Sequence, residues 1–390
     1  MLLGHDLLEP TVDTRAWREA LSLVSAGYEV TVFCWARRDD SLPAEETRDG
    51  VCVRRIFASL DSWLPGRMLA FRSAMRQLAE AAADDLPAVV HAHDLETLPA
   101  ACRAADACDA RVIFDAHEDW PLLERVQGAA LGAWFGWQQR RWLPRADTVV
   151  TVSPELAKRL GGAEVLYNSE PLAVVEAPVR EDLRAKLGLG GVVAGYIGAL
   201  RRRIIEQLLD TAAQVPEVTL LVVGGPPKGR TGYAGLQEQL ETYAAKVGAR
   251  AVFTGPLAYD CMGDCYRACD LLLVGHYVAE PLRHAAVPKK LLDAMAYSIP
   301  AIVGPYEARR SIVERHRCGL VADEWLAPLR KLAGDSELRR EMGLRGAAAW
   351  REKYSWDRME ERLLALYAGL LATPEAASYT HLRAHQTPRH

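Results

Sequence analysis

Strand-like runs alternate with helical patterns along almost the whole chain, and this alternation constrains the fold more than any other feature. In the first half these runs are YEVTVFCW (28–35), AVVHAH (88–93), RVIFDAH (111–117) and DTVVTVS (147–153). In the second half they are VVAGYIG (192–198), VTLLVVGG (218–225), ARAVFTG (249–255), DLLLVGH (270–276) and PAIVG (300–304). Apolar strands joined by helices favour parallel sheets that helices cover on both faces. The two series therefore predict an α/β protein with two doubly wound domains.

The length and composition agree with two globular domains in a reducing cytoplasm. A chain of 390 residues is long for a single hydrophobic core. Its net charge of −4 argues against nucleic acid as the main partner. No apolar run approaches the roughly 20 residues of a membrane span, and the start MLLGHDLLEP lacks the features of a signal peptide. Eight cysteines in a chain of this size do not indicate a disulfide framework.

Three of these cysteines, Cys261, Cys265 and Cys269, recur every four residues. On a helix they would lie along one face over about 12 Å, which is too extended for a single zinc ion. Small buried side chains are the preferred interpretation, and no metal site is predicted.

The domain boundary is predicted in YNSEPLAVVEAPVRED (167–182), which has two prolines and no helical period. We expect a first domain over 1–170, a second over 183–352, and a last helix at about 355–373. The segment 374–390 is polar, and its end ASYTHLRAHQTPRH carries three histidines. We interpret it as disordered or extraneous to the fold, with a metal-binding tail as the alternative.

Polar residues directly after strands are the first candidates for a site, because ligands of open α/β sheets bind beyond the carboxyl ends of the strands. His93 and Asp94 follow one strand, and Asp115, His117 and Glu118 end or follow the next. Each of them alone could be a helix cap or a solvated loop residue. Together they place histidines and carboxylates at one end of the first domain.

The second domain collects glycine and basic residues instead. Gly198 ends a strand and is followed by the arginines 201–203, and Pro288 begins a helix that carries Lys289 and Lys290. A helix N-terminus and arginine side chains both suit a phosphate group. A solvated basic edge is the simpler alternative. The P-loop pattern and G-x-G-x-x-G at the opening strands are both absent from the sequence.

Asp293 lies five residues after Pro288, about 7 Å along the helix axis. This is roughly the distance from a diphosphate to the hydroxyls of a ribose, and acids accept hydrogen bonds from vicinal diols. The alternative is an i,i+4 ion pair with Lys289, worth a few tenths of a kcal/mol.

The order and spacing of these segments resemble the retaining nucleotide-sugar glycosyltransferases of the GT-B fold, in the broad family four (group 1). The resemblance reaches to about Thr373. It rests on HDLLEPTVDTRAWREALSLVSAGYEVTVFCW (5–35), VVHAHDLETLPAA (89–101), FDAHEDWP (114–121), ADTVVTVSPELAKRL (146–160), VLYNSEP (165–171), GYIGALRRRIIEQLLDTA (195–212), VFTGPL (252–257), YRACDLLLV (266–274) and PKKLLDAMAYSIPAIVG (288–304).

The resemblance implies two Rossmann-like domains that face a central cleft, with the last helix crossing back to the N-terminal, acceptor-side domain. It implies that Arg203, with Arg202, contacts the donor diphosphate near Lys290, and that Asp293 holds the ribose. His117 would face the donor sugar. The full donor-binding set is Gly198, Arg202, Arg203, Leu257, Lys290 and Asp293; the acceptor-side set is His93, Asp94 and Glu118; and the catalytic set is His117, Arg203 and Asp293.

The implied reaction moves a hexose from a UDP- or GDP-linked sugar to a glycan or lipid-linked acceptor with retention, as in polysaccharide biosynthesis. Neither a metal nor another cofactor is expected, because arginine, lysine and helix N–H groups would stabilise the leaving diphosphate. A nucleotide-sugar epimerase of related fold and a non-catalytic, glycosyltransferase-like binding subunit are the alternatives.

The sequence departs from the family pattern around the donor site. The first of the two paired acids is replaced by Ala285, and the second, usually Glu, is Asp293. Ser298 stands where glycine is usual, and Ile204 follows Arg203 where glycine often follows a basic residue. Glu280 could replace the missing acid if its loop folds back.

The stretch AALGAWFGWQQRRWLPR (129–145) groups the aromatic residues Trp134, Phe135, Trp137 and Trp142 with the arginines Arg140, Arg141 and Arg145. Such a pattern is found in helices that lie on membranes, and also in helices that pack one face on a core. A peripheral contact with the inner face of the membrane would suit a lipid-linked acceptor.

Overall fold

The computed structural model describes residues 1–4, 14–36, 42–57, 64–125, 128–225, 235–275 and 287–372, with the backbone alone for 64–69. The chain divides into two compact units, of which the first comprises Met1–Leu166 and Met359–His390 and the second Tyr167–Arg358. Ala285, Glu280 and the tail 374–390, which the sequence singled out, lie outside the described residues.

The first unit is built on an eight-stranded sheet in the order β3-β4-β2-β1-β5-β6-β7-β8, parallel except between β3 and β4. The strands are β1 (Leu2–Leu3), β2 (Thr31–Ala36), β3 (Glu45–Arg48), β4 (Val51–Phe57), β5 (Val89–His93), β6 (Arg111–Ala116), β7 (Thr148–Thr151) and β8 (Glu164–Val165). Its helices are α1 (Thr14–Ser25), α2 (Leu64–Asp84), α3 (Leu98–Cys108), α4 (Trp120–Arg125), α5 (Ala129–Trp142), η1 (Leu143–Arg145) and α6 (Pro154–Arg159).

Alternation along β5 separates an apolar face of this sheet from a polar one. Val90 and Ala92 belong to the apolar core that α2 and α3 also line. His91 and His93, one residue apart from these, approach Glu19 of α1 instead. Because side chains alternate along a strand, the sequence VVHAH delivers two histidines to one face of the sheet.

The second unit holds a six-stranded parallel sheet in the order β11-β10-β9-β12-β13-β14. The strands are β9 (Val192–Ile197), β10 (Val218–Val223), β11 (Ala251–Gly255), β12 (Leu271–Val274), β13 (Ala301–Val303) and β14 (Gly319–Val321). The helices are α7 (Leu172–Val175), α8 (Leu183–Lys186), α9 (Arg202–Ala212), α10 (Leu236–Val247), η2 (Tyr259–Cys261), α11 (Met262–Arg267), α12 (Lys289–Ala296), α13 (Glu307–His316), α14 (Leu326–Gly334), α15 (Ser336–Ala349) and the π-helix η4 (Trp350–Tyr354).

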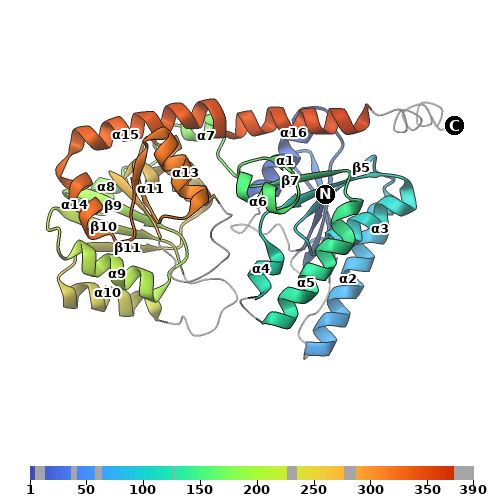
Figure 1. Cartoon of the computed structure of the whole chain (residues 1–390), viewed down its shortest axis with the longest axis horizontal. Helices are drawn as coiled ribbons and strands as arrows, with labels where there is room; N and C mark the ends of the chain where they lie inside the picture. The colour runs from blue at the N-terminus through green and yellow to red at the C-terminus, as the bar shows by residue number, and fades with distance from the viewer. Residues whose placement is uncertain are drawn as a thin grey trace. The chain divides into compact units, whose positions relative to one another are not determined.

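Two hydrophobic cores cover the two faces of this second sheet. All six residues of β10 are buried; Leu221 and Val223 enter the core that α12 lines, while Leu220 and Val222 enter the core that α9 and α10 line. Figure 1 shows the helices flanking the sheet within each unit. The predicted fold class, two Rossmann-like parallel sheets covered by helices, is therefore confirmed.

The last helix, α16 (Trp356–Leu371), returns to the first unit, as predicted. Its Tyr367 hydroxyl lies 3.0 Å from His91 Nδ1, and its ring lies 5.7 Å from that of Tyr28. The residues of the first unit are thus contributed by both ends of the chain (Figure 1). No helix in the described part of the chain combines the length and hydropathy that a bilayer-spanning segment needs.

The cysteine series is structural in the way the sequence predicts. Cys265 and Cys269 are buried in the core beside α12, and Cys261 is half-buried in η2. Burial raises the pKa of the Cys265 thiol to about 12, so that it stays protonated.

We predict that Trp350→Ala lowers the free energy of unfolding by about 3–5 kcal/mol, because it empties a fully buried site. The indole N–H of Trp350 also donates to Ser169 Oγ at 2.7 Å, a bond that the variant loses. Urea denaturation measures the change. Trp137→Ala, at a side chain that is 51% exposed, is the control and is expected to shift stability by only about 0.5 kcal/mol. Equal losses of unfolding free energy in both variants would contradict the burial of Trp350 in the core.

Candidate active site

A buried ion pair anchors the polar side of the first unit. The Arg15 guanidinium on α1 donates to both oxygens of Asp115 at the end of β6, with Nε–Oδ2 at 2.7 Å and Nη2–Oδ1 at 2.9 Å. It also donates to the Leu166 carbonyl. Burial would raise the pKa of Asp115, but Arg15 and then His117 hold it well below its ordinary range. Asp115 is therefore a carboxylate that two cations share.

His117 is the second of these cations. Its Nε2 lies 3.1 Å from Asp115 Oδ2, and its Nδ1 lies 3.5 Å from Asp94 Oδ2. Burial disfavours the charged ring, but Asp94 and Asp115 together raise the pKa of His117 to about 10. The ring is consequently an imidazolium at neutral pH, which can donate hydrogen bonds but cannot accept a proton.

The backbone around Asp94 positions this ring. Asp94 has φ of +64°, a left-handed conformation that aspartate tolerates better than most residues. In that conformation its amide donates to the Asp115 carbonyl at 2.9 Å, while its Oδ1 accepts from the His117 amide at 3.1 Å. His93 Nδ1 lies 3.2 Å from His117 Nε2. Three predicted residues, His93, Asp94 and His117, thus meet, and Glu118 is exposed beside them.

Glu19, His91, His93 and Asp115 together have the side-chain types of a metal site, with their ligand atoms within 4.8 Å of one another. However, the Arg15 guanidinium already bridges two of them, with Nε 3.2 Å from Glu19 Oε1 and 2.7 Å from Asp115 Oδ2. A divalent ion would have to share this buried space with a fixed positive charge. The arrangement fits an ion-paired core better than a metal centre.

In the second unit, glycines form a floor at the carboxyl ends of three neighbouring strands. Gly198, Gly224 and Gly255 end or follow β9, β10 and β11 with φ of +144°, +136° and +69°. The Gly198 amide donates to the Val223 carbonyl at 2.9 Å, and the Gly224 amide to the Gly255 carbonyl at 3.0 Å. A Cβ on Gly224 would overlap the Gly198 carbonyl. We call Gly198, Gly224 and Gly255 the glycine floor.

Lys290 of α12 lies on the glycine floor. A Cβ on Gly198 would be 2.7 Å from Lys290 Nζ, which also lies 5.2 Å from the centre of the Tyr196 ring. Burial first, and then the charges of Arg309 and Arg201, lower the pKa of Lys290 to about 8. Three cationic side chains therefore converge near the end of β9, an arrangement that an anion would stabilise.

Of the three consecutive arginines, it is Arg201, at the N-cap position of α9, whose charge acts on Lys290, and not Arg202 or Arg203. Arg202 and Arg203 are exposed on the first turn of α9, and Arg202 is bound to Glu206 and Gln239. The structure thus brings Gly198 and Lys290 together and leaves Arg202 and Arg203 on the outer side of the helix start. Only the α9 cap geometry distinguishes the three arginines, and the sequence pattern RRR carries no signal for it.

Asp293 faces a different space from Lys290. It is buried, and both its oxygens lie 2.9 Å from Lys289 Nζ. The Tyr266 hydroxyl donates to Oδ2 at 2.8 Å. Lys289 is also paired with Glu170, which accepts a hydrogen bond from the Tyr259 hydroxyl. The i,i+4 pair that the sequence offered as an alternative is therefore present.

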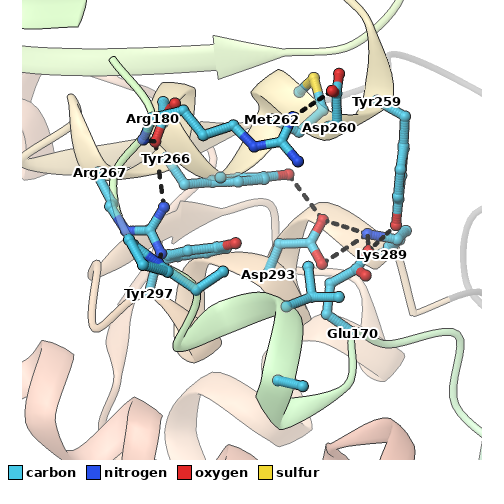
Figure 2. A pocket seen from close by; sticks show the side chains of 16 residues that line it. Glu170, Arg180, Tyr259, Asp260, Met262, Tyr266, Arg267, Lys289, Asp293 and Tyr297 are labelled. Atoms are coloured by element: carbon cyan, nitrogen blue, oxygen red, sulfur yellow. Dashed lines mark hydrogen bonds and ion pairs between the residues drawn. The ribbon is translucent and has the colours of Figure 1, made fainter. Parts of the chain in front are cut away.

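A cavity of about 310 Å³ lies beside this network. Figure 2 shows the carboxylate of Asp293 between Lys289 and Tyr266, with Glu170 and Tyr259 beyond the lysine. Burial raises the pKa of Asp293, Lys289 opposes this shift, and the nearby charge of Glu170 adds to it. Leu257, which the resemblance includes in the donor-binding set, packs against the apolar core next to α12.

Sequence reasoning missed Glu170, Arg309, Arg15 and Glu19. Glu170 lies near the start of the second unit, where no periodicity marks a buried acid. Arg15 and Glu19 occur on a helix whose pattern looks amphipathic, and an i,i+4 pair on such a helix normally indicates a solvated face. The histidines of β5 are the only sequence signal for the burial of Arg15 and Glu19, because buried imidazole rings need polar partners.

Models of two protein families match most of the chain. Residues 11–177 match the Glycosyl transferase 4-like domain, and residues 191–332 match the Glycosyl transferases group 1. A curated relative is the D-inositol 3-phosphate glycosyltransferase of Mycobacterium tuberculosis (strain ATCC 25618 / H37Rv), 26% identical over 383 residues, which cover 90% of this chain and 77% of the relative.

Solved structures share the fold at lower identity. The sucrose-phosphate synthase of Thermosynechococcus elongatus superposes with a TM-score of 0.77 at 20% identity, covering 95% of this chain and 98% of that one. The Anabaena protein Alr3699/HepE, solved with UDP-glucose, gives a TM-score of 0.69 at 16% identity over 94% and 98% of the two chains.

We predict that His117 makes stability fall as the pH rises from about 6.5 to about 10. Its pKa in the folded chain is about 10, above its ordinary value of about 6.5, so the stabilisation is complete below pH 6.5 and is lost on passing the folded pKa. The slope is at most about 1.4 kcal/mol per pH unit. Urea denaturation of wild type and His117→Gln at several pH values isolates this residue, since Lys290 titrates in both proteins.

Asp94→Asn provides the matched control for the His117 prediction. It removes one of the two carboxylates that raise the pKa of His117. The pH range over which His117 loses its stabilising effect should therefore become narrower, but it should not disappear. A difference between wild type and His117→Gln that does not depend on pH would contradict a protonated His117.

Proposed function

This chain is a glycosyltransferase of the GT-B fold that belongs to the family of GT4 and group 1 enzymes, and we propose that it transfers a hexose from a UDP- or GDP-linked sugar to a glycan or lipid-linked acceptor. The observation that carries the proposal is Lys290 against Gly198 of the glycine floor, with Arg201 and Arg309 near enough for their charges to act on it. It is a place for an anion at the carboxyl edge of a parallel sheet.

We place the donor diphosphate on this floor. As the bond between the sugar C1 and the phosphate oxygen lengthens, the electron pair of that bond passes to the leaving diphosphate. Lys290 and the N–H groups at the start of α12 then stabilise the increase in negative charge, because they are already in place. Arg203 on α9 is proposed to reach the same diphosphate. These cations supply the charge that a metal ion supplies in other transferases, so the proposed reaction needs no metal.

The ribose is proposed to bind at Asp293, with the base beside Leu257. Asp293 is a buried acceptor, and acids bind vicinal hydroxyls well. Its present partners, Lys289 and Tyr266, would share it with the ribose hydroxyls.

On the acceptor side we propose that His117 donates a hydrogen bond to a sugar oxygen, with His93, Asp94 and Glu118 around it. A ring with a pKa of about 10 is protonated and cannot act as the general base. The proton of the attacking hydroxyl would therefore pass to an oxygen of the leaving diphosphate. Attack from the face that the diphosphate leaves retains the anomeric configuration.

The proposal predicts transfer of sugar from UDP-glucose, tried first because the Anabaena protein of the same fold was solved with that donor. Release of UDP should depend on an added acceptor, continue in a chelator and fall by at least tenfold in His117→Ala. Chromatography of the sugar products follows the reaction across a panel of UDP- and GDP-sugars and acceptors.

The two alternatives give different outcomes in the same assay. Conversion of the donor to its epimer without acceptor would identify an epimerase and overturn the proposal. Absence of both turnover and nucleotide binding across the whole panel would indicate a binding subunit for another partner.

We also predict that UDP binds more weakly as the pH rises above about 8, because the free Lys290 ammonium loses its charge there. Lys290→Met should weaken binding roughly tenfold or more at pH 7 and remove most of this pH dependence. Asp293→Ala and Arg203→Ala should each weaken binding while the fold remains intact. Isothermal titration calorimetry with UDP and with GDP measures the affinities.

Lys246→Met, at an exposed lysine of α10, is the charge-matched control and should bind the nucleotide like wild type. If Asp293→Ala and Arg203→Ala also bind like wild type, the nucleotide lies elsewhere.

A further inference from the structure

The outer face of α5 carries an exposed apolar and basic surface that the proposed reaction does not use. Leu131, Trp134 and Trp137 are 39%, 38% and 51% exposed, and Arg140 and Arg141 are exposed beside them. We call these five residues the α5 face. We propose that the α5 face docks on a lipid bilayer that carries anionic headgroups.

The inner side of α5 is already packed against the rest of the first unit. Trp134 and Trp137 are therefore surface residues, and are not core residues left exposed by missing packing. Gly132 is buried against Arg125 of α4, where a Cβ would lie 2.7 Å from the Arg125 Cβ. Trp142 is buried beneath the guanidinium groups of Arg103, Arg145 and Arg141, the last of which is exposed as well. Figure 1 shows α4 and α5 in the first unit, and they contact each other.

The α5 face is a continuous stripe because of the helical period. Leu131, Trp134 and Trp137 follow at intervals of three residues, and Arg141 lies four residues after Trp137. Residues three and four apart are neighbours on a helix surface. Within the described residues, both tryptophans among the exposed large apolar side chains belong to this one stripe.

The charge of this segment has a single sign. Residues 128–145 contain three arginines and no acid. Arg145 is paired with Asp106 of α3, whereas the ion pairs found among the described residues include none from Arg140 or Arg141. A chain with a net charge of −4 thus presents a local basic surface around exposed indoles.

This chemistry matches a bilayer with anionic headgroups better than a protein partner. Indole rings favour the boundary between headgroups and acyl chains, since they have a large apolar body and one N–H donor. Basic residues beside them are attracted to anionic lipids. A second copy of this chain on the same face would bring two basic surfaces together, because a twofold contact joins the same patch of both subunits.

Co-sedimentation of the full chain with phosphatidylcholine vesicles, with and without phosphatidylglycerol, tests the proposal. Wild type should bind the anionic vesicles, bind the neutral ones far less, and be released by salt. Arg140→Gln with Arg141→Gln should lower partition roughly thirtyfold, at about fivefold for each basic residue near an anionic surface. Trp134→Ala with Trp137→Ala should lower it on the order of tenfold.

Leu344→Ala and Arg330→Gln are the matched controls, at exposed positions of α15 and α14 in the other unit. They should bind vesicles like wild type, and circular dichroism should show that every variant is folded. Two results would overturn the proposal. One is a wild-type chain that does not sediment with anionic vesicles. Self-association through Trp134 and Trp137 without vesicle binding would count as this result. The other is vesicle binding that the α5 substitutions leave unchanged.

Discussion

Burial of parallel strands on both faces is the constraint on which the rest of this structure depends. In β10 all six side chains are buried, divided between the two cores on opposite faces of the second sheet. A strand of this kind has no side chain left for polar chemistry, so functional groups must lie at its end or on the helix that follows. His93 at the end of β5, Asp94 directly after it, and Gly198 after β9 obey this rule.

The two units use that strand edge in opposite electrostatic ways. In the first unit, opposite charges are matched, since Asp115 accepts from Arg15 and lies beside His117, whose charge Asp94 also stabilises. In the second unit, like charges meet, and they add to burial in lowering the pKa of Lys290 to about 8. A balanced cluster is stable without a ligand, whereas a group of cations gains stability when an anion binds. This contrast is the physical reason for assigning the diphosphate to the second unit.

Two departures from the family pattern, Ser298 and Asp293, have structural consequences. Ser298, where glycine is usual, has φ of +59°, so a side chain is held in a conformation that costs roughly 1–2 kcal/mol. Its carbonyl is also approached closely by Gly343 of α15, where a Cβ would overlap it. Asp293 has a shorter side chain than the usual glutamate, and Lys289 connects it to the buried Glu170. A second acid is therefore near Asp293, although it comes from a different segment than the family pattern predicts.

The sequence by itself determined the two parallel sheets, because alternating apolar runs and amphipathic helices have few other ways to bury their surfaces. It also identified the strand ends at which His93, Asp94, His117 and Gly198 occur. It did not predict β3, whose exposed and half-buried residues EETR lack a strand pattern, and it could not tell which of three consecutive arginines acts on Lys290. Only the tertiary structure decided the partners of each charge: Glu170 with Lys289, and Arg15 with Asp115, which is 100 residues away. Periodicity reports which face of an element is buried, but the charge that a buried acid meets there is set by a segment distant in the chain.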